Sequence, residues 1–488
     1  MSLSGVVKSI QDIMRQDAGV DGDAQRISQL VWMLFLKIYD AKESDWEVMD
    51  SMDGKTYVSV IPNELRWRSW AEDKEGLTGN DLIEFINGKL FPKLKDIEIQ
   101  EGMDERGVIV KYLFEDTYNY MKSGYLMRQV IDKINEIDFE SYEERHAFND
   151  IYESILKDLQ NAGNAGEFYT PRPVTQFIVD MVNPNLGESV ADFACGTGGF
   201  LICALNNLYS QLKGDKNTPE NINLIHRSIH GIEKKPLPHM LAVTNMVLND
   251  VDVPDIKHDN AFTMKHLRDY DESDMYNCIT MNPPFGGTEE DVILTYFPAN
   301  FRTKETADLF LVMIMHRLKD NGRAGVVLPD GFLFGEGVKT NIKEKLLSEF
   351  NLHTIVRLPN GVFNPYTGIN TNLLFFDNTG PTKDIWYFEH PLPEGYKNYT
   401  KTKPIKISEF DLEKAWWNDR ENEEFSSCSW KVSANEIIKR NYNLDIKNPN
   451  NLEEIVEKSS KELLEQLKNS NEITNKLINE IEKGLFNE

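Results

Sequence analysis

The chain has 488 residues, a hydrophobic content of 40% and a formal net charge of −26 at pH 7. This length predicts roughly two to four domains, and the longest apolar run, residues 30–36, is far shorter than the roughly 20 residues of a membrane span. We therefore expect a cytoplasmic protein without a membrane segment. The acidic balance excludes nucleic-acid binding by overall charge, because phosphate contacts need clustered Lys and Arg. Any DNA-binding surface has to be local or supplied by a partner.

The first part of the chain has a helical pattern. Leu30, Leu34 and Ile38 lie at helical spacing, and Asp21 or Asp23 stands where a helix N-cap is expected. A small, glycine-rich joint follows at residues 161–166. We predict a helical N-terminal domain over residues 1–163.

The rhythm changes after residue 164. Helical stretches alternate with short apolar runs, at residues 189–194, 229–232, 276–281, 324–328, 352–357 and 373–376. This alternation is typical of an α/β domain with a mostly parallel sheet, which we place at 164–391. The remaining part, 392–488, is a polar extension that ends in a helical pattern rich in Glu and Lys. That final helix packs either on its own chain or on another one.

A glycine-rich turn follows the first of these strands. The strand leads into Cys195-Gly196-Thr197-Gly198-Gly199, and a helical pattern comes next. Glycines at such a turn let the backbone approach a ligand, and the helix N-terminus offers N–H groups to an anion. A tight turn without a ligand is the plain alternative. About 35 residues further on, the second strand ends in Glu233, where a carboxylate accepts hydrogen bonds from ribose hydroxyls.

The loop departs from the G-x-G-x-x-G pattern, and the acid lies further away than the roughly 20 residues of a nicotinamide site. Both features favour a ligand with a carboxylate and a ribose, such as S-adenosylmethionine, over a pyrophosphate. Asp259, followed by Asn260, stands near the third strand, where a carboxylate would accept a bond from an adenine amino group; a polar loop is the alternative. We predict a Rossmann-like S-adenosylmethionine-dependent methyltransferase domain.

The apolar run at 276–281 ends in Asn282-Pro283-Pro284-Phe285. Two consecutive prolines fix two φ angles and remove two donors, which also suits a rigid surface turn. The exocyclic amine of adenine is a poor nucleophile because its lone pair is delocalised into the ring. The side-chain oxygen of Asn282 and the carbonyl of Pro283, held at fixed angles, would draw it toward tetrahedral geometry. Phe285 would stack on a base that has flipped out of the duplex.

These motifs resemble the amino-methyltransferases that modify N6 of adenine in DNA. Together with E-F-Y-T-P-R-P at 167–173 and the segments 328–334 and 358–363, they make the chain resemble the modification (methyltransferase) subunit of Type I restriction-modification systems over nearly its whole length. Phe193 departs from the proline that this family often has. The resemblance implies a target-adenine site at Asn282, Pro283, Pro284 and Phe285. It implies an S-adenosyl-L-methionine site formed by Glu167, Phe168, Tyr169, Thr170, Pro171, Arg172, Asp192, Gly196, Thr197, Gly198, Gly199, Glu233, Asp259 and Asn260.

The resemblance also implies partners. A separate specificity subunit would read the DNA sequence, two modification subunits would clamp double-stranded DNA around it, and a restriction or motor subunit is a further expected partner. The final helix would pack against the specificity subunit. The chain has no Walker-type loop or nuclease cluster, so we expect it neither to hydrolyse ATP nor to cut DNA. Its four cysteines show no paired spacing, and we predict no metal site.

Two other hypotheses stay open at this point. N-P-P-F also suits methyltransferases that act on glutamine side chains or RNA bases, because their planar nitrogens pose the same chemical problem. A DNA-clamp subunit whose methyltransferase site is silent is the second alternative, although the intact Asn282, Glu233 and glycine loop argue against it.

Overall fold

The computed structural model describes residues 3–73, 75–98, 105–139, 152, 170–364 and 367–450, and scattered helical positions between 464 and 478. The joint at 161–166 and most of the final helix lie outside the described residues. Within the described part of the chain, no helix is long and apolar enough to cross a membrane.

The N-terminal region is helical, as predicted. Its long α2 (Gly22–Met52) begins after Asp21, one of the two predicted N-caps, and buries the Leu30, Leu34 and Ile38 stripe completely. Around it pack α1 (Leu3–Met14), α3 (Trp67–Trp70), α4 (Gly79–Phe85), α5 (Phe91–Lys95), α6 (Glu105–Glu115), α7 (Gly124–Ile134) and the short turns η1 (Asn63–Leu65) and η2 (Ile86–Leu90). The described residues before 140 contain no strand.

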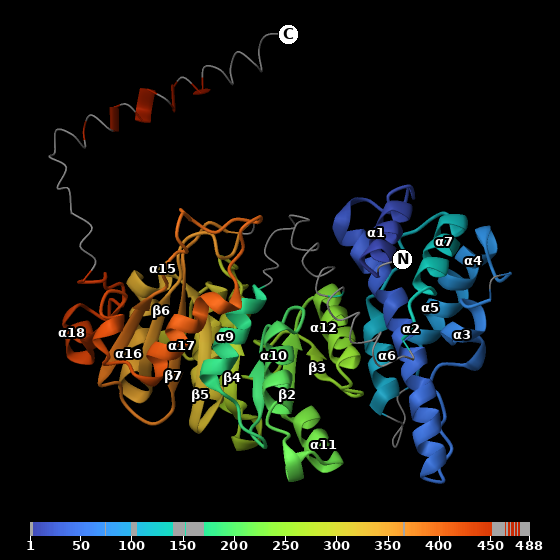
Figure 1. The fold of residues 1–488 in the computed structure, drawn as a ribbon, viewed down its shortest axis with the longest axis horizontal. Coiled ribbons are helices and arrows are strands. Elements are labelled where there is room, and N and C mark those ends of the chain that lie inside the picture. The colour runs from blue at the N-terminus through green and yellow to red at the C-terminus, as the bar shows by residue number, and fades with distance from the viewer. Residues whose placement is uncertain are drawn as a thin grey trace.

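A single nine-stranded sheet forms the second body (Figure 1). Its order is β3-β2-β1-β4-β5-β7-β6-β8-β9. The strands are β1 (Val190–Asp192), β2 (Ile229–Glu233), β3 (Asp255–His258), β4 (Tyr276–Met281), β5 (Leu318–Pro329), β6 (Asn351–Arg357), β7 (Thr371–Asp377), β8 (Asp384–Glu389) and β9 (Ser429–Ser433). The run from β3 to β5 is parallel, and β7 lies antiparallel between β5 and β6. This is the Rossmann-like α/β fold, and each of the six apolar runs noted in the sequence contains or lies within a strand.

Helices cover both faces of the sheet. Alternate strand residues point to opposite faces, so Val190 and Cys278 join one core while Ala191 and Ile279 join the other. The first face carries α9 (Arg172–Val182), α10 (Gly199–Tyr209), α11 (Pro219–Ser228), α12 (Pro236–Leu248) and α17 (Asp411–Asn418). The second carries α13 (Asp291–Leu294), α14 (Thr306–Arg317), α15 (Asp330–Phe334), α16 (Val338–Glu349) and α18 (Ala434–Lys439).

Two details differ from expectation. Asn321-Gly322 stands before the apolar run at 324–328, and such a pair commonly ends a helix, but α14 ends earlier, at Arg317. Asn321 instead has a positive φ of 59° inside β5, a left-handed conformation that Asn adopts more readily than most residues. The three-part division of the chain stays a prediction, and the sheet crosses its second boundary because β9 pairs with β8.

Buried polar contacts join the N-terminal helices to the sheet domain. Lys42 on α2 lies 3.1 Å from a carboxylate oxygen of Asp250 and 3.0 Å from one of Asp252. The indole N–H of Trp46 donates to Asp252 over 2.9 Å. Because Lys42 is almost fully buried, it needs these carboxylates to compensate for its lost hydration. The two regions therefore meet at α2 and the end of α12.

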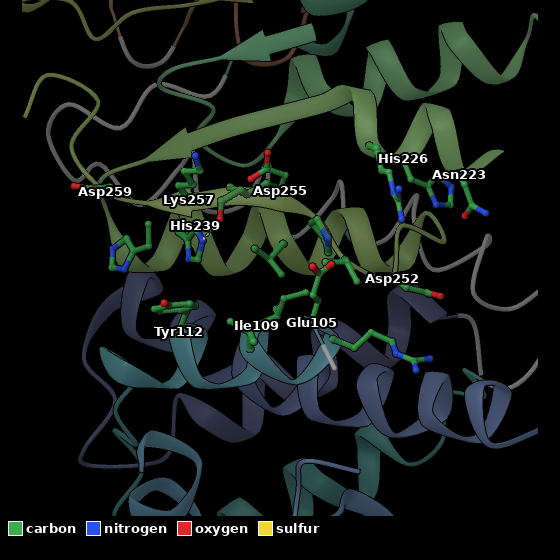
Figure 2. A pocket seen from close by; sticks show the side chains of 18 residues that line it. Glu105, Ile109, Tyr112, Asn223, His226, His239, Asp252, Asp255, Lys257 and Asp259 are labelled. Carbon is green, nitrogen blue, oxygen red and sulfur yellow. Dashed lines mark hydrogen bonds between the residues drawn. The ribbon is translucent and has the colours of Figure 1, made fainter. Parts of the chain in front are cut away.

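A cavity of about 1260 Å³ opens next to this contact. Figure 2 shows Glu105, Ile109 and Tyr112 of α6 on one wall, and His239 of α12 with Asp259 after β3 on the other. The cavity therefore runs along the edge strand of the sheet.

The burial of His239 should make the free energy of unfolding depend on pH in the acidic range. It is buried on α12, donates through Nε2 to the carbonyl of Ile256 over 2.9 Å, and burial lowers its pKa to about 4. The unfolded chain takes up this proton near pH 6.5. Between pH 6.5 and 4 the unfolded state thus binds more protons, so the free energy of unfolding falls as the pH is lowered.

We expect His239→Gln to remove about one proton, or about 1.4 kcal/mol per pH unit, from this slope in urea titrations at pH 7, 6, 5 and 4.5. Part of the slope will remain, because burial also lowers the pKa of His353 to about 4. An unchanged slope in the variant would contradict the assignment to His239.

Candidate active site

Several of the predicted site residues meet at the carboxyl ends of β1 and β4. These strands are parallel neighbours, so the segments that follow them emerge at the same edge of the sheet. A narrow cavity there is lined by Thr170, Thr175, Asp192, Ala194, Cys195, Gly196, Thr197, Gly199, Phe200 and Asn282. The structure therefore brings the glycine loop and the N-P-P-F turn together.

The glycine loop has a backbone that larger residues would strain. Gly196 and Gly198 have φ values of 56° and 80°, in the left-handed region that favours glycine. A β-carbon on Gly199 would stand 2.9 Å from Nη1 of Arg172. Helix α10 begins at Gly199, and the N–H groups of a first helical turn have no partners within the helix. The loop thus forms a close, donor-rich wall.

Glu233 ties the end of β2 to this loop. Its Oε2 accepts a hydrogen bond from the Gly196 N–H over 2.9 Å, and its Oε1 accepts one from the Lys235 N–H over 2.7 Å. These two bonds fix the orientation of the Glu233 carboxylate beside the glycine loop.

Asp192 is a second carboxyl group in the site. It is fully buried, and its Oδ1 accepts a bond from the Ala194 N–H over 3.0 Å. Burial raises the pKa of Asp192 well above its usual range, and the nearby Glu233 carboxylate adds to the rise. Acids perturbed in this way are concentrated at ligand-binding and catalytic sites.

Asn282 is held in one orientation. Its Nδ2 donates to Oγ1 of Thr170 over 2.9 Å, and the side chain is only 9% exposed. Its Oδ1 is buried and accepts no hydrogen bond from any described residue. Leaving such an oxygen without a donor costs about 1–3 kcal/mol. The amide therefore presents an acceptor to the cavity that a bound molecule can satisfy.

The rest of the turn provides an aromatic wall. Pro283 and Phe285 are buried and Pro284 is half-buried. The ring of Phe285 meets that of Phe363 edge to face, with centroids 6.3 Å apart. Phe363 belongs to the 358–363 segment noted in the sequence, to which no contact had been assigned.

Other predicted residues take different places. Pro171 and Arg172 lie at the start of α9, while Glu167, Phe168 and Tyr169 lie outside the described residues. Asp259 is exposed on the rim of the large cavity rather than in the narrow one, and only its backbone reaches Glu233, through an N–H donated to the Glu233 carbonyl over 3.1 Å. The Oδ1 of Asn260 accepts a bond from Phe262 N–H over 3.1 Å.

Sequence reasoning missed several contributions. It placed Thr170 in a cofactor segment but not as the partner of Asn282, and it did not single out Thr175 or Phe200. The position of Thr175, one turn into α9 on the buried side, was the available signal. Among the described residues, no group of three or more His, Cys, Asp or Glu side chains is arranged to hold a metal ion.

Comparison with known proteins agrees with this geometry. Residues 143–458 match the family model for N-6 DNA methylases, and residues 3–134 match that for the HsdM N-terminal domain. The methylase subunit of the Type I restriction enzyme EcoEI from Escherichia coli is 56% identical over 92% of this chain and 91% of its own.

Solved structures are similar as well. A modification subunit of a putative Type I restriction enzyme from Vibrio vulnificus has a TM-score of 0.81 and 44% identity, covering 92% of this chain and 97% of that one. A chain from a study of complex assembly and conformational transition in a Type I restriction-modification system has a TM-score of 0.81 and 36% identity, covering 100% and 99%. The chain therefore belongs to the N-6 DNA methylase family, among the methylase subunits of Type I restriction-modification systems.

Proposed function

We propose that this DNA methyltransferase subunit uses S-adenosylmethionine to methylate N6 of an adenine flipped out of DNA. The observation that carries the proposal is the Asn282 amide: buried, fixed by Thr170, and presenting an Oδ1 that no described residue satisfies. An adenine amino group is a donor that fits such an acceptor.

The chain's own residues then prepare the amino group. Oδ1 of Asn282 and the carbonyl of Pro283 accept its two hydrogen bonds and draw nitrogen lone-pair density out of the ring. The prolines keep both acceptors at fixed angles, so little reorganisation is needed as positive charge develops on nitrogen. Phe285, buttressed by Phe363, would stack on the base. The proton leaves after methyl transfer, when the alkylated nitrogen is acidic, so no strong base is required beforehand.

The residues present fit the proposed cofactor. Glu233 would accept bonds from the ribose hydroxyls, the start of α10 would face the carboxylate, and the buried Asp192 would face the ammonium group. Thr170 to Arg172, together with the predicted Glu167, Phe168 and Tyr169, would complete the methionine side. Asp259 and Asn260 would lie at the adenine end. When bound, S-adenosylmethionine supplies an electrophilic methyl group.

The proposed partners are those that the Type I family implies, and they account for the charge of the chain. With a net charge of −26, the chain would hold DNA more readily with a basic surface from a partner. A specificity subunit would supply it and select the target, with two modification subunits on double-stranded DNA and a restriction or motor subunit as a further partner. We propose that the protein acts in the cytoplasm.

The test is methyl transfer from labelled S-adenosylmethionine to genomic DNA lacking the modification, with and without the co-expressed specificity subunit. We expect label on N6 of adenine, and only with the partner present. Label with the isolated chain would contradict the partner requirement. Label on another base, on RNA or on a glutamine side chain would contradict the proposed substrate, and a chain that binds no cofactor would be a silent clamp.

A further inference from the structure

A chain of acidic, imidazole and phenol groups, all buried except the half-buried Glu409, lies behind the target-base side of the site. His390 follows β8, and its Nδ1 hydrogen-bonds to a carboxylate oxygen of Glu413 on α17. Its Nε2 lies 3.2 Å from the hydroxyl of Tyr399, which donates to Oε2 of Glu409 over 2.5 Å. Burial and the Glu409 carboxylate raise the pKa of Tyr399, so the phenol keeps its proton.

These groups resemble a catalytic triad in spacing, but no substrate reaches them. His390, Tyr399 and Glu413 are each at most 2% exposed. Such a chain instead fixes the place of the central ring, because a buried hydroxyl and imidazole that lose their partners are costly. The residue held most tightly is Tyr399.

The backbone of Tyr399 holds the 358–364 turn through two hydrogen bonds. Its N–H donates to the Asn360 carbonyl over 3.1 Å, and its carbonyl accepts a bond from Nδ2 of Asn364 over 2.9 Å. Gly361 has a φ of 87°, and a β-carbon there would stand 2.1 Å from the Tyr399 carbonyl oxygen. The approach is so close that only glycine fits.

The turn and the extension reach both sides of the active site. The turn carries Phe363, which meets Phe285 edge to face. The same extension stacks Phe410 on Phe177 of α9, with centroids 4.4 Å apart, and pairs Lys414 with Asp180 over 2.7 Å. Helix α9 begins beside Thr170, the partner of Asn282. Residues of the C-terminal extension thus support α9 and the Phe363–Phe285 pair from the side away from the cavity.

We propose that the Glu413–His390–Tyr399–Glu409 chain consists of positioning residues that hold the Phe363–Phe285 wall against the target base. The inference rests on the proposed function, because it assumes that a flipped base lies on Phe285. It predicts that loosening Tyr399 impairs the chemical step and the placement of the base, while the cofactor side, built on β1 and β2, is left intact.

The test compares the hydroxyl groups of two buried tyrosines, Tyr399 and Tyr387, in the complex with the specificity subunit. Tyr399→Phe removes the bond to His390 and Glu409. Tyr387 lies on β8, away from the turn, and its hydroxyl donates to the Leu444 carbonyl over 3.0 Å. Tyr387→Phe removes that hydrogen bond. We expect kcat for methyl transfer to fall about 10-fold in Tyr399→Phe and to stay near wild type in Tyr387→Phe. Cofactor Kd should stay within about twofold in both variants.

A second readout is 2-aminopurine fluorescence, with the probe at an adenine mapped as methylated in host DNA. A less tightly held base gives a changed signal in Tyr399→Phe but not in Tyr387→Phe. If Tyr399→Phe fails to fold, Asn364→Ala serves as the test. It removes the hydrogen bond from Asn364 to the Tyr399 carbonyl and should show the same fall in kcat. A wild-type kcat and signal in a folded Tyr399→Phe or Asn364→Ala overturns the inference. An inactive wild-type complex overturns the proposed function instead.

Discussion

Asn282→Ala lowers kcat for methyl transfer by about 10²–10³-fold, the loss expected when a preorganised polar group that acts only on the developing charge is removed. The variant loses the acceptor oxygen, while the glycine loop and Glu233 are unaffected, so cofactor Kd should stay within about twofold. The Thr170 hydroxyl loses one partner, at a cost of about 1 kcal/mol in stability. Single-turnover methyl transfer and titration calorimetry of cofactor binding measure the two effects separately.

Two matched variants sharpen this result. Asn282→Asp keeps acceptor oxygens and should retain more activity than alanine. Asn378→Ala removes an equally polar side chain in the β5–β7 region, where its amide donates to the Lys319 carbonyl over 3.2 Å, and should leave kcat unchanged. Equal rates for Asn282→Ala and wild type would remove the basis of the proposed chemistry.

Glu233→Ala should raise the cofactor Kd by about 10²-fold or more, because each hydrogen bond to a charged group contributes about 1.5–3 kcal/mol. The substitution removes the proposed ribose acceptor and also releases the Gly196 and Lys235 N–H groups that the carboxylate orients. Titration calorimetry of S-adenosylmethionine binding to the isolated chain gives the Kd directly.

The controls separate charge from shape. Glu233→Gln keeps the side-chain length and one acceptor oxygen, and should weaken binding less than alanine. Glu220→Gln removes a carboxylate from the exposed surface of α11 and should bind cofactor like wild type. If Glu233→Ala bound with wild-type affinity, the acidic residue after β2 would not be the ribose ligand.

Much of the sheet could be predicted because its strands are buried on both faces and read as apolar runs. β8 and β9 were less visible. β8 contains only the short apolar run Ile385–Phe388, and in β9 Trp430 and Val432 alternate with polar residues as strand positions do. Their signal is short and lies among polar residues, so local pattern alone does not separate it from a loop. Asn321 misleads in the opposite direction. Asn-Gly pairs often end helices, but here Asn321 takes a positive φ within β5, where the pairing with β4 is irregular.

The active site also has features that the sequence could predict and features that it could not. That the segments after β1 and β4 meet could be predicted, because parallel neighbours end at one edge of a sheet. The pairing of Thr170 with Asn282 could not, since it joins residues 112 positions apart with no shared pattern. The hydrogen bonds between Tyr399 and the 358–364 turn likewise depend on tertiary packing that no periodicity records.

The late position of β9 bears on how the protein is made. β8 pairs with β6 on one side and with β9 on the other, and β9 comes about 40 residues later in the chain. Until the ribosome has released Ser429–Ser433, β8 is an unprotected edge that can pair with another nascent chain. The methylase therefore completes its catalytic sheet only after Ser429–Ser433 has been synthesised, and slow or interrupted synthesis of residues 390–433 exposes the chain to aggregation.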